Sequence, residues 1–182
     1  TGLQHGTVTV LDGGASFEVT TFRCESGYAD GRHPDEVAFV TDVEADLARR
    51  DFTINAMAWS VDGRLVDPHG GRPDLEAGRV RCVGRAEERL REDALRMLRA
   101  LRFACELGFR LTPSVWRAIR DNAAGLRQVA MERVAAEWDK MMAGADPDRA
   151  AALLARSGLL RETKEPLPAA ARGSGRPGRP GR

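Results

Sequence analysis

The sequence lacks the features that mark a secreted, zinc-binding or membrane-spanning protein. Its three cysteines, Cys24, Cys82 and Cys105, are scattered without a CxxC pair or a histidine partner. This spacing argues against a zinc site and against a disulfide framework. No signal peptide is visible, and no apolar run is long enough to span a bilayer. The sequence therefore predicts a protein of the reducing cytoplasm that does not bind a membrane.

A strong excess of charge is also missing. Lys+Arg 28 against Asp+Glu 27 gives a formal net charge of +1, so bulk charge does not mark the chain as a nucleic-acid binder. Nearly all the cations are arginines, whose guanidinium forks suit phosphates and base edges. A genome-wide composition bias explains the arginines equally well. Any affinity for RNA must therefore come from where individual arginines are placed.

The first 83 residues contain strand patterns and one helix pattern. Residues 7–11 and 16–22 alternate with a period of two, and Asp12-Gly13-Gly14 between them predicts a hairpin turn. Residues 46–58 predict a helix, although the Thr53-Ile54 pair weakens that pattern. The same region predicts a polar loop at residues 28–34, a short strand at 37–41, and edge strands at 65–68 and 79–83.

Residues 84–160 predict helices only. Apolar residues at helical spacing run from Ala86 to Leu107 and stop at Gly108. Thr112-Pro113 supplies an N-cap followed by proline at the first helical position. Two more helices are predicted, at about residues 131–142 and 146–158. Residues 161–182 are rich in Gly, Pro and Arg and are predicted to be a disordered tail. The predicted division is thus 1–83, 84–160 and 161–182.

The most informative stretch is RRDFTINAMA at residues 49–58, which places polar groups at the start of an apolar run. Burying Arg50, Asp51 and Asn55 costs desolvation energy unless these groups have partners. A ligand with phosphates and hydroxyls would supply them. The alternative is a helix N-terminus with a carboxylate in its first turn and two ordinary surface arginines. A second charged pattern, REDALRMLRALRF, follows at residues 91–103.

Together with the other motifs, these two patterns resemble the class II tRNA nucleotidyltransferase and bacterial poly(A) polymerase family. Those enzymes build or repair the CCA end of tRNA, or add adenylate tails to RNA. The ordered motifs begin with HGTV at residues 5–8 and EVTTFR at 18–23, continue through DPHGG at 67–71, and end with MERV at 131–134. The resemblance implies an α+β fold, with a partial nucleotidyltransferase mixed sheet (a hairpin plus a helix) followed by an all-helical neck domain.

Nucleotidyl transfer requires a 3′-hydroxyl to attack the α-phosphate, usually with two metal ions held by carboxylates. In the resembled family the principal ligands are a pair of aspartates on a strand, and no Asp-x-Asp on a strand occurs here. The resemblance implies that the ligands of the expected Mg²⁺ lie upstream of Thr1. Glu18 shares one strand face with Thr20 and Phe22 and is the candidate catalytic acid. The alternative is that Glu18 is a solvent-facing strand residue.

Three residues are candidates for the sugar and phosphates of a nucleotide. Arg50 suits a triphosphate through a charge-assisted contact. Asp51 suits a ribose hydroxyl, and Asn55 lies one helical turn further on the same predicted face. The alternative is that Asp51 and Asn55 bond to each other and merely close the start of a helix.

Asp93 and Arg96 are three residues apart on a predicted helix, so we expect them to pair and to read a base. The carboxylate accepts from the amino group of cytosine or adenine, and the guanidinium donates to the ring nitrogen beside it. Uracil and guanine present the opposite pattern and are rejected. The resemblance gives this role to a Glu-Asp-x-x-Arg motif, matched by Glu92, Asp93 and Arg96, and places Arg99 and Arg102 towards the nucleotide as well. A solvated helix face is the alternative for Arg99 and Arg102.

Arg133 and Glu137 are four residues apart in the predicted helix at 131–142. The spacing predicts an ion pair between them. The resemblance places a helix that supports the pocket here, and an exposed pair is the alternative.

The resemblance implies a template-independent RNA nucleotidyltransferase that adds CMP and AMP, from CTP and ATP, to the 3′ end of tRNA. We expect this chain alone to be inactive or very weak, because one carboxylate cannot hold two magnesium ions. A bacterial poly(A) polymerase remains open, because these motifs do not separate it from CCA addition. A non-catalytic RNA- or nucleotide-binding chain and a purely structural domain remain open too. The oligomeric state is not predicted.

Overall fold

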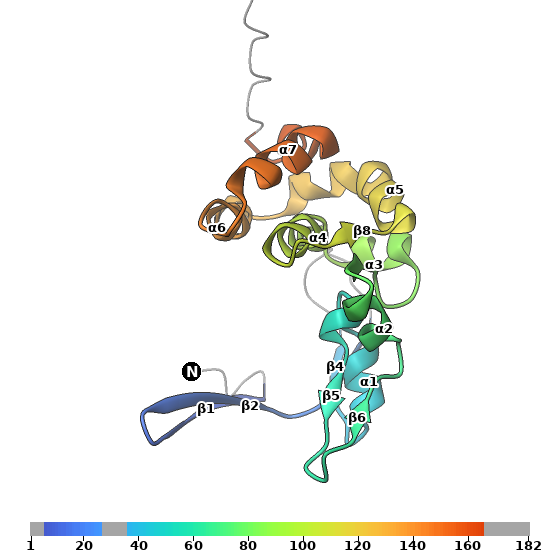
Figure 1. The fold of residues 1–182 in the computed structure, drawn as a ribbon, viewed down its shortest axis with the longest axis vertical. Helices are drawn as coiled ribbons and strands as arrows, with labels where there is room; N and C mark the ends of the chain where they lie inside the picture. The colour runs from blue at the N-terminus through green and yellow to red at the C-terminus, as the bar shows by residue number, and fades with distance from the viewer. Residues whose placement is uncertain (1–5, 27–35, 166–182) are drawn as a thin grey trace, which may run out of the picture.

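The structure is a computed structural model that describes residues 6–26 and 36–165. Figure 1 shows a long hairpin at one end, a group of short strands and helices beside it, and a helical bundle at the other end. No helix in this part of the chain is long and apolar enough to cross a bilayer. The predicted α+β class, with a hairpin and a helix ahead of a helical part, is confirmed, but a short strand, β8 (Arg110–Leu111), lies within residues 84–160, where only helices were predicted. The polar loop predicted at residues 28–34 lies outside the described residues.

The described strands form four two-stranded sheets and not one mixed sheet. The predicted hairpin is confirmed, since β1 pairs antiparallel with β2 around Gly13 and Gly14, whose φ angles of 55° and 82° favour glycine. The short strands predicted near residues 37, 65 and 79 are also present. The strands are β1 (Thr7–Asp12), β2 (Ala15–Thr20), β3 (Arg23–Ser26), β4 (Glu36–Phe39), β5 (Ala58–Trp59), β6 (Leu65–Val66), β7 (Arg79–Val80) and β8 (Arg110–Leu111).

The helix predicted over residues 46–58 is wrong. Helix α1 (Val43–Ala48) begins at the Asp42 cap and ends ten residues before the predicted end, and only a short 3-10 turn, η2 (Thr53–Asn55), follows. Phe52 is extended and forms an antiparallel bridge to Cys82, and the Thr53 amide donates to the Arg81 carbonyl at 2.9 Å. Backbone pairing with a distant segment therefore overrides the local helix pattern, as the β-branched Thr53 favours.

The single helix predicted from Ala86 to Leu107 is divided at Asp93. Helix α3 (Ala86–Glu92) ends there, because Asp93 has extended backbone angles of φ −142° and ψ 106°. Its side chain then accepts a hydrogen bond from the Leu95 amide at 3.0 Å, at the start of α4 (Leu95–Glu106). An aspartate side chain that bonds to a nearby amide competes with the helix and favours a new helix start.

The remaining predicted helices are confirmed; α6 and α7 pack against α4, and α5 packs against α3. The core includes Leu98, Leu101 and Ile119, all at most 1% exposed, and Trp116 and Trp138 pack against it half-buried. Figure 1 shows α4 in the middle of the bundle, with α5 and α7 on the far side of it from α1. The predicted helices are α5 (Pro113–Asn122), α6 (Met131–Met142) and α7 (Pro147–Ser157). The structure adds α2 (Gly71–Glu76), η3 (Ala123–Gln128) and η4 (Leu159–Arg161), which the sequence did not predict.

The first residues of the predicted tail belong to the described part of the chain. Residues 161–165 are described, and Thr163 among them is only 3% exposed, with its hydroxyl bonded to the Leu160 and Glu165 carbonyls. Residues 166–182 lie outside the described part of the chain. The division at residues 1–83, 84–160 and 161–182 stays a prediction.

Gly71 fixes the segment that follows α1. A Cβ added at Gly71 would lie 2.1 Å from the Thr53 carbonyl oxygen and 2.8 Å from Met57 Cγ. Asp67 holds the same turn, because its carboxylate accepts from the Gly71 amide at 2.6 Å and the Arg72 amide at 2.9 Å. The start of α2 thus packs directly on η2.

Replacing Gly71 with alanine should destabilise the fold. The added methyl group must push the Thr53 backbone away, and overpacking of this kind costs about 1–3 kcal/mol. Gly125→Ala is the matched control, because its Cβ would meet the Ala94 Cβ at an ordinary 3.4 Å. Urea denaturation followed by circular dichroism measures both free energies of unfolding. Equal stability of the two variants would contradict the packing described here.

Candidate nucleotide-binding site

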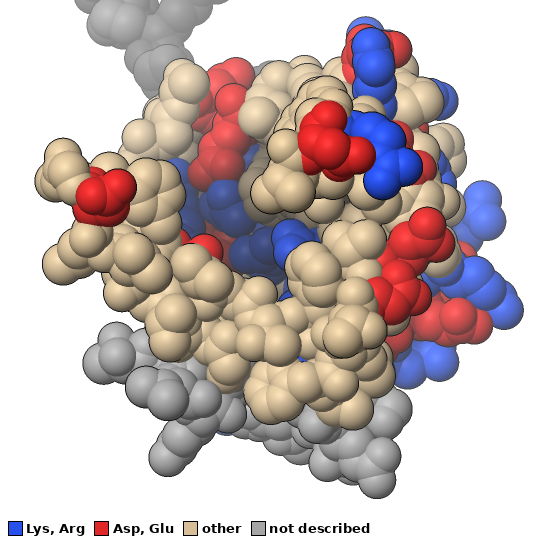
Figure 2. Space-filling view, turned by 90° about the horizontal axis from the view of Figure 1, so that it is seen from below, with Lys and Arg blue, Asp and Glu red and all other residues tan. Residues whose placement is uncertain are grey.

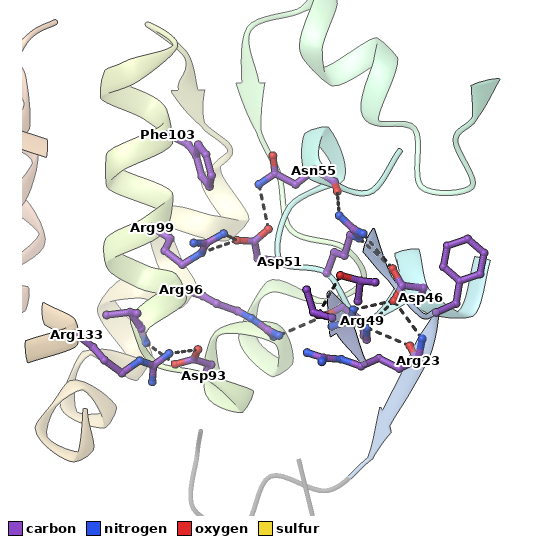
Figure 3. Close-up of a pocket in the computed structure, with 15 residues that line it drawn as sticks. Arg23, Asp46, Arg49, Asp51, Asn55, Asp93, Arg96, Arg99, Phe103 and Arg133 are labelled. Atoms are coloured by element: carbon purple, nitrogen blue, oxygen red, sulfur yellow. Dashed lines mark hydrogen bonds and ion pairs between the residues drawn. The ribbon is translucent and has the colours of Figure 1, made fainter. Parts of the chain in front are cut away.

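A polar hollow of about 740 Å³ lies between the segment that follows α1 and the start of α4. Figure 2 shows basic side chains gathered in a hollow of this face with acidic ones beside them, and Figure 3 shows the side chains that line it. Six arginines and three aspartates contribute to the lining. The charged and amide residues are Arg23, Asp46, Arg49, Arg50, Asp51, Asn55, Asp93, Arg96, Arg99 and Arg133.

The carboxylate of Asp51 connects the two walls of the hollow. One oxygen accepts from the Phe52 amide at 2.8 Å and from Asn55 Nδ2 at 3.1 Å. The other oxygen accepts from Arg99 Nε at 2.8 Å and lies 2.7 Å from Arg99 Nη2, so two nitrogens of this α4 guanidinium converge on a single oxygen (Figure 3). The Asp51 side chain is only 8% exposed. The predicted alternative of an Asp51–Asn55 hydrogen bond is therefore present, together with a pair that the sequence did not predict.

Asp46 lies at the end of α1 and pairs with two arginines. Its oxygens lie 2.7 Å from Arg49 Nη2 and 3.0 Å from Arg50 Nη2, and the Arg23 amide donates to it at 3.3 Å. Burial disfavours the charged carboxylate, but the hydrogen bonds from Arg49 and Arg50 outweigh it and hold the pKa of Asp46 below its ordinary value. Arg50 also donates to the Asn55 carbonyl, and its side chain remains 44% exposed at the hollow.

The predicted pair between Asp93 and Arg96 does not form. Asp93 instead lies 2.9 Å from Arg133 Nη2 on α6, and Arg96 Nη1 lies 2.6 Å from Glu92. The helix break at Asp93 is the reason, because the two residues no longer sit three apart on one helix. Both still line the hollow, and the second terminal nitrogen of Arg133, Nη1, is buried without a hydrogen-bond partner in the described structure.

Two predicted contacts are wrong: Arg102 does not face the hollow, and Arg133 does not pair with Glu137. Arg102 is buried, donates to Glu137 at 2.6 Å and to Glu106 at 2.7 Å, and does not line the hollow. Its guanidinium stacks on Phe103 at 4.1 Å from the ring centroid. Glu137 therefore pairs with Arg102 across two helices, while Arg133 pairs with Asp93. The periodic arginine stripe of α4 turns inward at Arg102, which spacing alone does not reveal.

Glu18 lies on β2 opposite Thr9 and is exposed. It is not among the residues that line the hollow. Within residues 6–26 and 36–165, no three His, Cys, Asp or Glu side chains lie close enough together to hold a metal ion. The surroundings described for Glu18 correspond to the solvent-facing alternative.

Several lining residues were not among the predicted site residues. Asp46, Arg49 and Arg23 meet at one side of the hollow, where Arg49 Nε donates to the Arg23 carbonyl at 3.1 Å and to Asp46 at 3.0 Å. Arg49 lies in the motif at residues 49–58 and Arg23 in the motif at residues 18–23. Membership of these motifs was the sequence feature that could have identified both residues. Phe103 forms part of the lining and meets Phe52 edge to face at a centroid distance of 5.8 Å.

Two family models match the chain. One, described as "Poly A polymerase head domain", matches residues 1–81, and the other, described as "Probable RNA and SrmB- binding site of polymerase A", matches residues 108–169. Together they cover most of the chain but leave out residues 82–107, which contain α3 and α4.

Curated relatives and solved structures cover that segment too. A CCA-adding enzyme of Lactiplantibacillus plantarum is 53% identical over 147 residues, which is 81% of this chain and 36% of the relative. One of Latilactobacillus sakei is 50% identical over 161 residues, or 88% and 41% of the two chains. The Bacillus stearothermophilus CCA-adding enzyme in complex with CTP aligns with a TM-score of 0.79 at 45% identity, over 87% of this chain and 38% of that one. This chain thus spans about two fifths of these relatives' length.

Replacing Asp46 with asparagine should reduce stability in a pH-dependent way. The pKa of a paired aspartate is lower in the folded chain than in the unfolded chain, so its contribution is present above about pH 3.9 and is lost as the pH falls further. The difference in unfolding free energy between wild type and Asp46→Asn should therefore be largest at pH 7 and shrink towards pH 3. Urea denaturation at several pH values measures it. Asp139→Asn, at an exposed position on α6, is the control, and a difference independent of pH would contradict the ion pairs.

Proposed function

Because this chain belongs to the class II tRNA nucleotidyltransferase and bacterial poly(A) polymerase family, we propose that it forms the nucleotide-selecting part of an RNA nucleotidyltransferase. The proposed reaction adds CMP and AMP, from CTP and ATP, to the 3′ end of tRNA. The observation that carries the proposal is the hollow in which six arginines outnumber three aspartates and two candidate base-reading side chains face the same space. A nucleoside triphosphate has the charge and the hydrogen-bonding groups that such a lining matches.

The triphosphate would lie against the arginines beside α1. Arg50 suits it best, because its guanidinium is half-exposed at the hollow while its partner Asp46 is almost buried. A phosphate that approaches from the open side would add charge-assisted hydrogen bonds without removing Asp46. Arg50 recognises phosphate and not base, so it serves CTP and ATP equally.

The sugar would lie near Asp51 and Asn55, which are joined by a 3.1 Å hydrogen bond. Asp51 is already held by Arg99 and by the Phe52 amide, so its orientation is fixed before a ligand arrives. Preorganised acceptors of this kind lower the cost of ordering the site on binding. The pair thus suits a ribose hydroxyl, and Arg99 acts by positioning Asp51.

The base would be read by Asp93 and Arg96. Each of them now has an internal partner, Arg133 for the carboxylate and Glu92 for the guanidinium. A cytosine or adenine edge can replace both partners, because it offers an amino donor to Asp93 and a ring-nitrogen acceptor to Arg96. Uracil and guanine present a carbonyl where cytosine and adenine present the amino group, and a ring N–H where those bases present the ring-nitrogen acceptor. They would therefore break the internal pairs without matching Asp93 and Arg96.

A poly(A) polymerase is the second candidate, because the family model that matches residues 1–81 is described by that activity. The curated relatives named above are CCA-adding enzymes, and this favours CCA addition. A cytoplasmic location belongs to the same proposal, since the described cysteines are free thiols.

A divalent metal, which we propose is Mg²⁺, belongs to the reaction of the whole enzyme. The acidic residues of the described chain do not fit a metal site, because none of them gather in a group of three and Glu18 stands alone on an exposed strand. The proposed chemistry of this chain is therefore limited to binding, orienting and selecting the nucleotide. Glu18 stays a proposed catalytic acid on the resemblance alone.

Replacing Arg50 with alanine should weaken CTP and ATP by the same factor, since the lost contact is to phosphate. A hydrogen bond to a charged group contributes about 1.5–3 kcal/mol, which corresponds to roughly a 10- to 150-fold loss of affinity. Isothermal titration calorimetry with the full chain measures both dissociation constants. Arg72→Ala is the matched control, because Arg72 is exposed and pairs with Glu76 outside the hollow. A loss confined to one nucleotide would refute the phosphate assignment.

Replacing Asp93 with alanine should relax the choice of base. CTP and ATP lose the acceptor for their amino group, while Arg96 stays able to donate to the carbonyl of UTP or GTP. We expect the preference for CTP over UTP, measured as the ratio of dissociation constants, to fall by about 1–3 kcal/mol. Arg96→Ala should instead weaken CTP and ATP together. If Asp93→Ala lowers the affinity for all four triphosphates equally, Asp93 has a structural role and the base-reading assignment is wrong.

A further inference from the structure

Arg89 on α3 is a largely buried arginine that has no part in the site described so far. Its side chain is 15% exposed and does not line the nucleotide-binding hollow. Its Nε donates to the Val83 carbonyl at 3.2 Å, and its Nη2 donates to the Ala48 carbonyl at 2.8 Å. Its Nη1 donates both to the Arg49 carbonyl at 3.2 Å and to Glu92 at 2.9 Å. One guanidinium, with five N–H donors in a plane, therefore joins three separate segments of the chain.

Two of these hydrogen bonds close the C-terminal end of α1. The last carbonyls of a helix have no partner within the helix, and a cation beside them is favourable. Helix α1 has no basic residue in its own last turn, so Arg89 supplies the cation from 40 residues further along the chain. The Arg49 carbonyl belongs to the peptide plane that leads into Arg50, the proposed triphosphate contact. Arg89 thus holds the backbone that carries Arg50.

Arg96, the proposed base-reading arginine, is attached to the same group of residues. Its Nη1 donates to Glu92 at 2.6 Å and to the Arg89 carbonyl at 2.9 Å. Its Nη2 donates to the Arg49 carbonyl at 3.3 Å, and Figure 3 shows this side chain extending from α4 towards Arg49. The same oxygen of Glu92 accepts from Arg89 and from Arg96. Arg89 and Glu92 therefore connect the base-reading side of the hollow with its phosphate-binding side.

A base that binds to Arg96 takes one partner away from Glu92. In the proposed binding mode, a ring nitrogen replaces Glu92 at the guanidinium of Arg96. Glu92 is only 28% exposed, so a carboxylate left there without a charged partner would weaken binding. Arg89 stays 2.9 Å from Glu92 and compensates its charge after the exchange. The benefit goes only to a ligand whose base uses Arg96.

We propose that Arg89 is a positioning residue for base selection. It holds the end of α1 together with Glu92, so that Arg96 can exchange Glu92 for cytosine or adenine while Arg50 keeps its place at the triphosphate. This inference rests on the proposed function, because it needs a nucleotide in the hollow. Neither family model includes Arg89, since one match ends at residue 81 and the other begins at residue 108.

The test compares a nucleotide with its phosphate part alone. Isothermal titration calorimetry on the full chain measures CTP, UTP and inorganic tripolyphosphate with wild type and with Arg89→Met, which keeps an unbranched side chain but removes every donor. CTP should bind about tenfold more weakly, because contacts that must form together lose affinity when their spacing is no longer fixed. UTP and tripolyphosphate should lose less than about twofold, since neither presents a matched base edge to Arg96. Arg50 keeps its own partner, Asp46, in all variants.

Arg149→Met is the matched control. Arg149 is also half-buried and donates to a backbone carbonyl, that of Phe109 at 2.6 Å, but it lies outside the nucleotide-binding hollow. This variant should bind all three ligands as wild type does. Arg89→Lys keeps the charge but not the planar fork, so it should show the same loss confined to CTP, by a smaller factor. Thermal denaturation measures the folding of each variant, and Arg89→Lys carries the test if Arg89→Met does not fold.

The exchange through Glu92 has its own test. Glu92→Gln removes the carboxylate that Arg89 is proposed to compensate. In that background, Arg89→Met should weaken CTP by a smaller factor than it does in wild type, because the two residues act as a pair. An equal factor in both backgrounds would contradict the exchange.

Two results would overturn the proposal outright. Equal losses for CTP, UTP and tripolyphosphate in Arg89→Met would show that Arg89 only supports the fold, and unchanged CTP affinity would show that it has no role in binding. A wild-type chain that binds no CTP would refute the proposed function as well. A wild-type chain that prefers CTP over UTP, with an Arg89→Met variant that keeps the same preference, would refute this inference alone.

Discussion

The structure depends on one carboxylate. Asp51 holds the turn that contains Phe52 and Asn55, and its second oxygen binds Arg99 on α4 through two nitrogens. It therefore joins the N-terminal part to the helical part at the point where the hollow opens. Removing Arg99 would leave the nearly buried Asp51 carboxylate without a charged partner, and a buried charge without such a partner destabilises the fold. Asp51, which the sequence predicts as a nucleotide contact, therefore also stabilises the packing of the N-terminal part against α4.

The same hollow is filled with internal ion pairs that a nucleotide can exchange. Asp93 pairs with Arg133 and Arg96 pairs with Glu92, so neither candidate base-reading group is left uncompensated before a ligand arrives. The cost of breaking these pairs is small for a base that restores both hydrogen bonds and large for one that restores neither. Selectivity then comes from the difference in binding free energy between a base that restores both hydrogen bonds and a base that restores neither. It does not come from the strength of the contact to Asp93 or to Arg96 alone.

The sequence predicted the elements whose signals are local. The Gly13-Gly14 hairpin, α5 with proline in its first turn, and α7 with its Asp146 cap are present as expected, although the Thr112 side chain makes no capping hydrogen bond to α5. The helix over residues 46–58 was wrong because Phe52 and Thr53 pair with residues 81 and 82, which no local pattern reveals. The candidate site residues Arg50, Asp51, Asn55, Asp93, Arg96 and Arg99 all line one hollow. The partners of Asp93 and Arg96 were not predictable. Asp93 pairs with Arg133 on another helix, and Arg96 pairs with Glu92 on the other side of the helix break. Arg102 faces inward for the same reason, since Glu137 lies on another helix.

The central claim is that the hollow between the segment after α1 and the start of α4 selects a nucleotide. A crystal structure of this chain with CTP tests it most directly. The account predicts the triphosphate against Arg50, and the cytosine amino group and ring nitrogen against Asp93 and Arg96, with the pairs to Arg133 and Glu92 lengthened or broken. CTP bound with its base touching neither Asp93 nor Arg96, or bound only outside this hollow, would contradict it.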